Sequence, residues 1–181
     1  HIRNLSTDYR PLEFDTSNKD NSSISPVIRD SIEYLNKSED GFGVIRVSKT
    51  SIAVELRKQI RKKYKNIYDV AVIGCREECD LSIRDGFSEI YHKIHVRRKK
   101  MILIIINALS AGKDLNRLKN YFRFGIESRK SQLANGSQGI PGRVCGYHKN
   151  RDFIIYANRG LLKHYSEFEL DPEIYENDLW R

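Results

Sequence analysis

Short apolar runs alternate along this chain with longer segments of helical periodicity. The runs are rich in β-branched residues, which is typical of buried strands, and they comprise Gly43–Val47, Tyr68–Ile73, Met101–Asn107 and Asp152–Tyr156. Strands that alternate with helices of ten or more residues predict βαβ units and therefore a parallel sheet. We expect an α/β fold with a mostly parallel sheet of about five strands and helices on both of its faces.

The helical segments and the polar stretches suggest how the chain is divided. The predicted helices are Pro26–Leu35 behind the N-cap residue Ser25, Ile52–Tyr64, one between Asp80 and Tyr91, a weaker stretch after Leu115 that runs through Tyr121 and Phe122, and residues 159–170. Residues 1–26 are polar and have the composition of a linker or exposed loop. We therefore expect a linker and lead-in helix over residues 1–36 and one domain over residues 37–181.

Charge and composition limit the classes of function. The net charge of +8, from 32 Lys and Arg against 24 Asp and Glu, favours a polyanionic partner such as nucleic acid. The longest apolar run, Met101–Leu109, is far shorter than the roughly 20 residues that cross a bilayer, so no membrane partner is expected. Three cysteines, an odd number, favour a reducing cytoplasm. Because the first residue is His1, we expect the chain to begin within a longer protein.

The segment Ile104–Leu115 carries a first group of candidate site residues. A buried strand ends in it, and small residues then lead into Gly112 and Asp114. Ligands of open α/β sheets bind at the carboxyl ends of strands, where Gly112 allows close backbone approach and Asp114 can orient a water, a ribose hydroxyl or an arginine. Ala111–Lys113 is similar to the end of a P-loop, but Asn107 replaces its first glycine and Asp114 its Ser or Thr, so we reject a P-loop.

A second candidate segment, Gln138–His148, places a glutamine and an arginine in a loop rich in glycine. The guanidinium of Arg143 stays charged near neutral pH, and its forked donors match phosphoryl oxygens. As an arginine finger it would stabilise the charge that builds up on a transferring phosphoryl group. The alternative is an ordinary surface salt bridge. His148 either contacts nucleic acid or caps the strand that follows.

Taken together, residues 41–157 resemble the second RecA-like domain of superfamily 2 helicases. Gly43–Lys49, followed by the helix at Ile52, is similar to motif IV; Ser110–Asp114 resembles motif V; and Gln138–Gly146 resembles motif VI. Each lies at a strand end and their order agrees with the family. Motif VI departs from the family pattern, because Gly142–Arg143 comes one residue late and Gly146 replaces the second arginine. Gly146-Tyr147 is similar to the ending in phage-type helicases.

The resemblance implies a role for each matched position. Arg143 would be the arginine finger, supported by Gln138. Gly112 and Asp114 would contact the nucleotide and link it to the nucleic acid. The implied nucleic-acid contacts are Ser48, Lys49, Thr50, Ser110 and His148. If the family's finger is its second arginine, Arg143 must replace it here or activity is weak.

The resemblance also implies cofactors and partners. In this family the Walker A lysine and the acidic Walker B box belong to the first RecA-like domain, and neither motif occurs in this chain. ATP and Mg²⁺ are therefore implied for the full-length protein. The chain alone is expected to hold no cofactor and not to hydrolyse ATP. The implied partners are DNA, with RNA as the alternative, and the N-terminal RecA-like domain of the same chain.

A basic helix adds further candidate contacts. The run Arg57–Lys65 carries six basic residues, and Arg57, Arg61 and Lys65 share one helix face at i, i+4 spacing. These residues either track the phosphates of a nucleic acid or form a solvated helix face.

The same residues are compatible with other classes of function. One is a nucleic-acid-binding or adaptor module without catalysis, built on a degenerate RecA-like fold. A nuclease is disfavoured, because Glu77, Glu78 and Asp80 cluster in an expected loop without a strand-borne lysine.

Two cysteines and two histidines form a candidate zinc site. Cys75 and Cys79 lie near His92 and His95 at spacings that zinc tolerates. Cys75 closes an expected strand and the histidines sit in a basic stretch, so no metal site is predicted.

Overall fold

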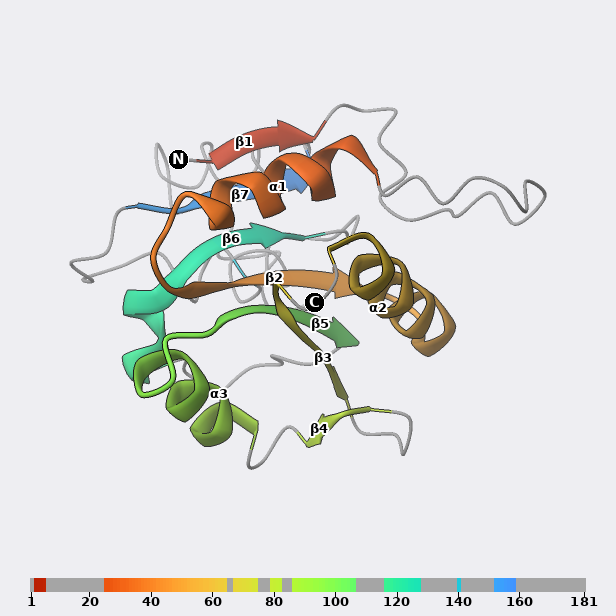
Figure 1. Ribbon diagram of the computed structural model, residues 1–181. Helices are drawn as coiled ribbons and strands as arrows, with labels where there is room; N and C mark the ends of the chain where they lie inside the picture. Colours follow the sequence, from red (N-terminus) through yellow and green to blue (C-terminus); the bar gives the residue numbers. More distant parts are fainter. Residues whose placement is uncertain are drawn as a thin grey trace, which may run out of the picture.

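The computed structural model describes residues 2–5, 25–64, 67–74, 79–82, 86–106, 116–127, 140 and 152–158. These residues form a seven-stranded sheet of order β1-β7-β6-β2-β5-β3-β4, in which every neighbouring pair is parallel (Figure 1). The strands are β1 (Ile2–Leu5), β2 (Gly41–Val47), β3 (Asp69–Gly74), β4 (Leu81–Ser82), β5 (Lys100–Ile106), β6 (Phe122–Ile126) and β7 (Ile154–Asn158). Five of these strands have five or more residues. The predicted α/β, RecA-like parallel sheet is confirmed.

Helices cover both faces of the sheet. The helices α1 (Pro26–Asn36) and α2 (Thr50–Tyr64) pack on one face, and α3 (Gly86–His95) with the 3-10 helix η1 (Asn116–Tyr121) packs on the other. Alternate residues of the central strand divide between the two cores: Val44 faces α3, whereas Ile45 faces α1 and α2. Full burial of an aliphatic side chain contributes about 1.5–3 kcal/mol, so such residues hold the helices on the sheet.

The strands β2 and β6 approach each other closely at Gly43. Gly43 is paired with Phe124, and a Cβ atom at Gly43 would lie 1.9 Å from Cε1 of the Phe124 ring. The ring is fully buried in the core beneath α1 and α2, so it has no open space to move into. A glycine is therefore required at this position of the central strand.

The structure corrects the sequence prediction after Leu115. The helical stretch expected to run through Phe122 ends at Tyr121, and Phe122–Ile126 forms the strand β6. Phe122 packs in one core and Phe124 in the other, because the segment lies between β2 and β7. Burial on both faces of a sheet overrides the local helical preference.

The remaining expected elements agree in position with α1, α2, α3, β2, β3, β5 and β7. The helix expected at residues 159–170 lies outside the described residues. The domain boundary expected at residue 36 stays a prediction. On its amino-terminal side, β1 pairs with β7, and α1 buries Ile28, Ile32 and Leu35 against the sheet.

Replacing Gly43 tests the close packing of β2 on β6. Gly43→Ala should lower the free energy of unfolding by about 1–3 kcal/mol, because the added methyl group must displace the Phe124 ring. Urea unfolding followed by circular dichroism measures this change. In the double variant Gly43→Ala/Phe124→Leu, the cost should be less than the sum of the two single costs. Strict additivity would contradict the proposed contact.

Candidate functional site

The two central strands β2 and β6 lie next to each other, but the chain leaves their carboxyl ends in opposite directions. From β2 it passes through α2 to β3 on one side of the sheet, and from β6 it continues to β7 on the other. In open parallel sheets a ligand crevice forms outside the carboxyl ends of two strands whose connections diverge in this way. We call this place the switch site and define it by Arg46, Glu127 and the turn Ser48–Thr50.

A buried ion pair forms the floor of the switch site. Nη1 of Arg46, near the end of β2, lies 3.2 Å from Oε2 of Glu127, the residue directly after β6, and the side chains are only 1% and 0% exposed. The backbone N–H of Glu127 donates a hydrogen bond of 2.9 Å to the carbonyl of Tyr156 in β7. Removing two charges from water is costly, so such a pair is stable only when both partners are present. It fixes the ends of three strands relative to one another.

The polar turn at the switch site follows directly on a fully buried strand. Every residue of β2 is buried, whereas Ser48 and Lys49 are exposed and Thr50 begins α2. The carbonyl of Lys49 accepts the Ala53 N–H at 3.2 Å, which closes the first turn of the helix. That turn contains no acidic residue, so no side-chain charge within it offsets the positive end of the helix dipole. The switch site thus brings a hydroxyl, an ammonium group and a helix N-terminus together.

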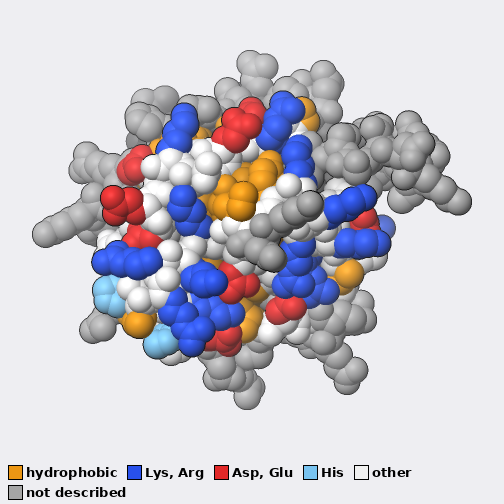
Figure 2. Space-filling view, viewed as in Figure 1, with side chains coloured by type: hydrophobic (Ala, Val, Ile, Leu, Met, Phe, Trp, Pro, Cys, Tyr) orange, Lys and Arg blue, Asp and Glu red, His pale blue; other side chains and the backbone are white. Residues whose placement is uncertain are grey.

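The arginines of α2 have partners within the fold. Basic side chains gather over this helix (Figure 2). Arg57 forms an ion pair of 2.6 Å with Asp80, whose second oxygen accepts the Val72 N–H at 2.8 Å. Arg61 donates to the Val70 carbonyl at 2.7 Å. Arg61 directly, and Arg57 through Asp80, therefore help to satisfy the hydrogen-bonding groups of the β3 backbone. This role needs no nucleic acid. Their contact with nucleic acid stays a prediction.

Six of the predicted site residues lie outside the described residues: Ser110, Gly112, Asp114, Gln138, Arg143 and His148. One residue between Gln138 and Arg143 is described. Ile140 is 1% exposed, and its Cγ2 atom occupies the space that a Cβ of Gly125 would need, at 2.6 Å. Ile140 therefore packs on β6 at Gly125, which precedes Glu127 by two residues.

The acidic and metal-ligating candidates have other contacts. The Asp80 carboxylate is engaged by Arg57 and Val72, and the His95 ring nitrogen Nδ1 is hydrogen-bonded to the Tyr121 hydroxyl. Within the described parts of the chain, no three His, Cys, Asp or Glu side chains are grouped so that they could hold a metal ion. Glu77, Glu78 and Cys75 lie outside these parts.

Sequence reasoning found the turn Ser48–Thr50 but missed the ion pair. The signal was present, because Arg46 interrupts a run of β-branched and apolar residues. A charged residue in a strand that is covered on both faces requires a buried partner. That partner, Glu127, could not be named because no strand was expected at Phe122–Ile126.

Neither the protein-family models nor the curated protein sequences contain a match to this chain. Among the helices that the structure describes, none has both the length and the apolar character needed to span a bilayer.

The buried pair is testable by a double-mutant cycle. Glu127→Ala should lower the free energy of unfolding by about 3–5 kcal/mol, because it leaves the Arg46 charge buried without this carboxylate. Arg46→Met/Glu127→Leu should recover most of the loss, since the double variant removes both charges. Chemical unfolding of the four proteins gives the coupling energy. A double variant as unstable as the worse single variant would contradict the pairing.

Proposed function

We propose that this chain is the second RecA-like domain of an ATP-dependent superfamily 2 helicase or translocase, and that its switch site binds the nucleic-acid backbone. The observation that carries this proposal is the turn Ser48–Thr50 at the start of α2, in which Ser48 and Lys49 are exposed, beside the point where the connections of two parallel strands diverge. The turn also lies in the segment that resembles motif IV.

The chemistry of the turn suits a phosphodiester. The Lys49 ammonium supplies a compact positive charge, the hydroxyls of Ser48 and Thr50 can donate to phosphate oxygens, and a helix N-terminus favours anions. Hydrogen bonds to phosphate position a protein on nucleic acid without reading its sequence, as a motor that moves along the strand requires. The switch site would therefore hold DNA, with RNA as the alternative, through its backbone.

The proposal assigns the nucleotide to the interface with a second domain. The complete protein would bind ATP and Mg²⁺ on the Walker motifs of an N-terminal RecA-like domain of the same chain. Arg143 would reach the γ-phosphate with Gln138 in support, while Gly112 and Asp114 would couple the nucleotide to Ser110 and the nucleic acid. Support comes from Ile140 itself, which is buried and packs against Gly125 of β6. Such a motor would work in the cytoplasm.

A non-catalytic nucleic-acid-binding module is the second candidate. It is favoured by one feature of the sequence, Gly146 in place of the second arginine of motif VI. The two candidates predict different sequences upstream of His1, because a motor requires a Walker A loop and an acidic box to be encoded there. They also differ in the complete protein, which hydrolyses ATP in the presence of DNA only if it is a motor.

Lys49 is the most direct test of backbone binding. Lys49→Ala should weaken binding of a fluorescein-labelled oligothymidine and reduce the slope of log K against log salt by about 0.7, the value for one phosphate contact on a single strand. Fluorescence anisotropy over a salt series measures both quantities.

Lys62→Ala is the matched control for this experiment. It removes the same charge from an exposed position of α2, the helix that begins directly after Lys49, and lies about 20 Å from Lys49 by helical rise. This control should change the affinity much less than Lys49→Ala. Equal effects of the two variants would mean that only net charge matters, and the proposed contact would be wrong.

A further inference from the structure

The loop between α3 and β5 lies at the opposite edge of the sheet from the switch site. The N–H groups of Val96 and Arg97 donate to the carbonyl of His92, and Lys99 N–H donates to the carbonyl of Lys93, so the loop folds back on the end of α3. Arg98 has a φ of 50°, in the left-handed region where glycine is favoured. The backbone bonds thus define the conformation of a loop that carries adjacent basic side chains.

Two basic side chains of this loop are not neutralised within the described parts of the chain. Arg98 forms an ion pair of 2.6 Å with Asp40, and Lys100 donates to the Asn36 carbonyl at 2.8 Å. Arg97 and Lys99 are exposed, and no described carboxylate lies within ion-pair distance of either. Figure 2 shows Lys and Arg side chains gathered here, over the end of α3 and the start of β5. The loop therefore presents positive charge to solvent.

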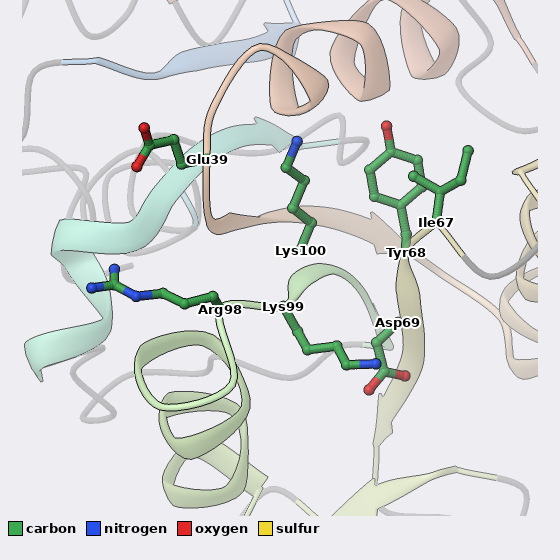
Figure 3. A pocket seen from close by; sticks show the side chains of 7 residues that line it. All are labelled: Glu39, Ile67, Tyr68, Asp69, Arg98, Lys99 and Lys100. Atoms are coloured by element: carbon green, nitrogen blue, oxygen red, sulfur yellow. The ribbon is translucent and has the colours of Figure 1, made fainter.

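An open cavity of about 550 Å³ adjoins the loop (Figure 3). Its lining combines basic and apolar groups with two carboxylates, and consists of Glu39, Ile67, Tyr68, Asp69, Arg98, Lys99 and Lys100. Asp69 is held by Lys93 at 3.2 Å, and the pKa of Lys93 is raised, mainly by its hydrogen bond with Glu89, so this lysine stays charged. Because Lys93 already pairs with the Asp69 carboxylate, this carboxylate repels an anion near Lys99 less strongly.

An exposed aromatic ring stands at the beginning of the loop. His95 stacks on Tyr91 with ring centroids 5.0 Å apart and an interplanar angle of 16°, and it meets the edge of Tyr121 at 5.8 Å. Both tyrosines pack against the core, so they hold the His95 ring in place while His95 itself remains exposed. A base can stack on such a ring, and stacking tolerates every base because each has a π-face.

From this arrangement we infer a second binding surface, for single-stranded nucleic acid, formed by His95, Arg97, Arg98 and Lys99. The backbone phosphates contact the loop cations and one base stacks on His95. We call it the amino-edge surface, because it lies where the strands begin. A single strand fits better than an acidic peptide, since the exposed ring next to the cations offers a stacking partner that carboxylates do not use. The inference does not depend on ATP hydrolysis or on the switch site.

Neutralising the loop tests the amino-edge surface in the whole 181-residue chain. Arg97→Ala/Lys99→Ala should weaken oligothymidine binding about tenfold and reduce the salt slope by about 1.4, the value for two single-strand phosphate contacts. Lys58→Ala/Lys62→Ala removes the same charge from exposed positions of α2 and should have a much smaller effect. Equal losses in the two double variants would overturn the inference.

Substitutions of His95 separate base stacking from charge. His95→Ala should weaken single-strand binding about fivefold or more and leave duplex binding unchanged, whereas His95→Phe should retain single-strand binding because it keeps a ring. Equal losses for Ala and Phe, or the same loss on duplex, would overturn the stacking contact. Competition by polyglutamate as effective as that by oligothymidine would assign the surface to acidic polymers instead.

Arg98→Gly guards against a loss of binding that is caused by unfolding. It removes a charge together with the surface ion pair to Asp40, and it also relieves the left-handed backbone, so these two effects on stability offset each other. Thermal stability should therefore be maintained while affinity falls about threefold. Unchanged affinity in this stable variant would contradict a role for Arg98. The switch site is tested separately: Lys49→Ala in the Arg97→Ala/Lys99→Ala background should weaken binding further if both surfaces act. If only the switch site binds, the loop variant alone has no effect.

Discussion

A single buried ion pair determines how the candidate site is arranged. Arg46 and Glu127 meet beneath the point where the connections of β2 and β6 diverge, and the backbone of Glu127 extends this link to β7. Such a pair contributes little net stability, because desolvation offsets most of the attraction. Its value here is positional: it joins the end of β2 to the residue after β6, so these strand ends are held relative to each other. The exposed turn that begins at Ser48 lies two residues from this fixed point.

The basic surplus of the chain is not equally available for binding. Arg57 and Arg61 bond to Asp80 and to the backbone of β3, and Arg98 shares the carboxylate of Asp40 with Arg123. Because α2 and α3 run back along a parallel sheet, their first and last turns lie at opposite edges. Within the part of the chain that the structure describes, exposed cations without such bonds are consequently found at both edges, at Lys49 on one and in the loop before β5 on the other.

Much of the fold followed from the sequence, but the contacts at the site did not. Hydrophobic periodicity located α1 and α2 and four of the five longer strands. Each of these helices buries one apolar face, and the strands bury apolar side chains on both faces of the sheet. Periodicity failed at Phe122–Ile126, because this short apolar run follows a helical turn and shows no clear hydrophobic period of its own. Its conformation is decided by burial between β2 and β7. The Arg46 pair depends on that strand, so local patterns could not reveal it. The packing of Ile140 on Gly125 is equally non-local.

Nuclear magnetic resonance of the isotope-labelled chain, titrated with an oligothymidine, tests the central claim most directly. If the switch site binds the backbone, the amide signals of residues 48–53 should shift progressively and saturate, because the first N–H groups of α2 face the phosphate. Signals from the middle of α1 should not move. Saturable binding that leaves the signals of residues 48–53 in place would contradict the account.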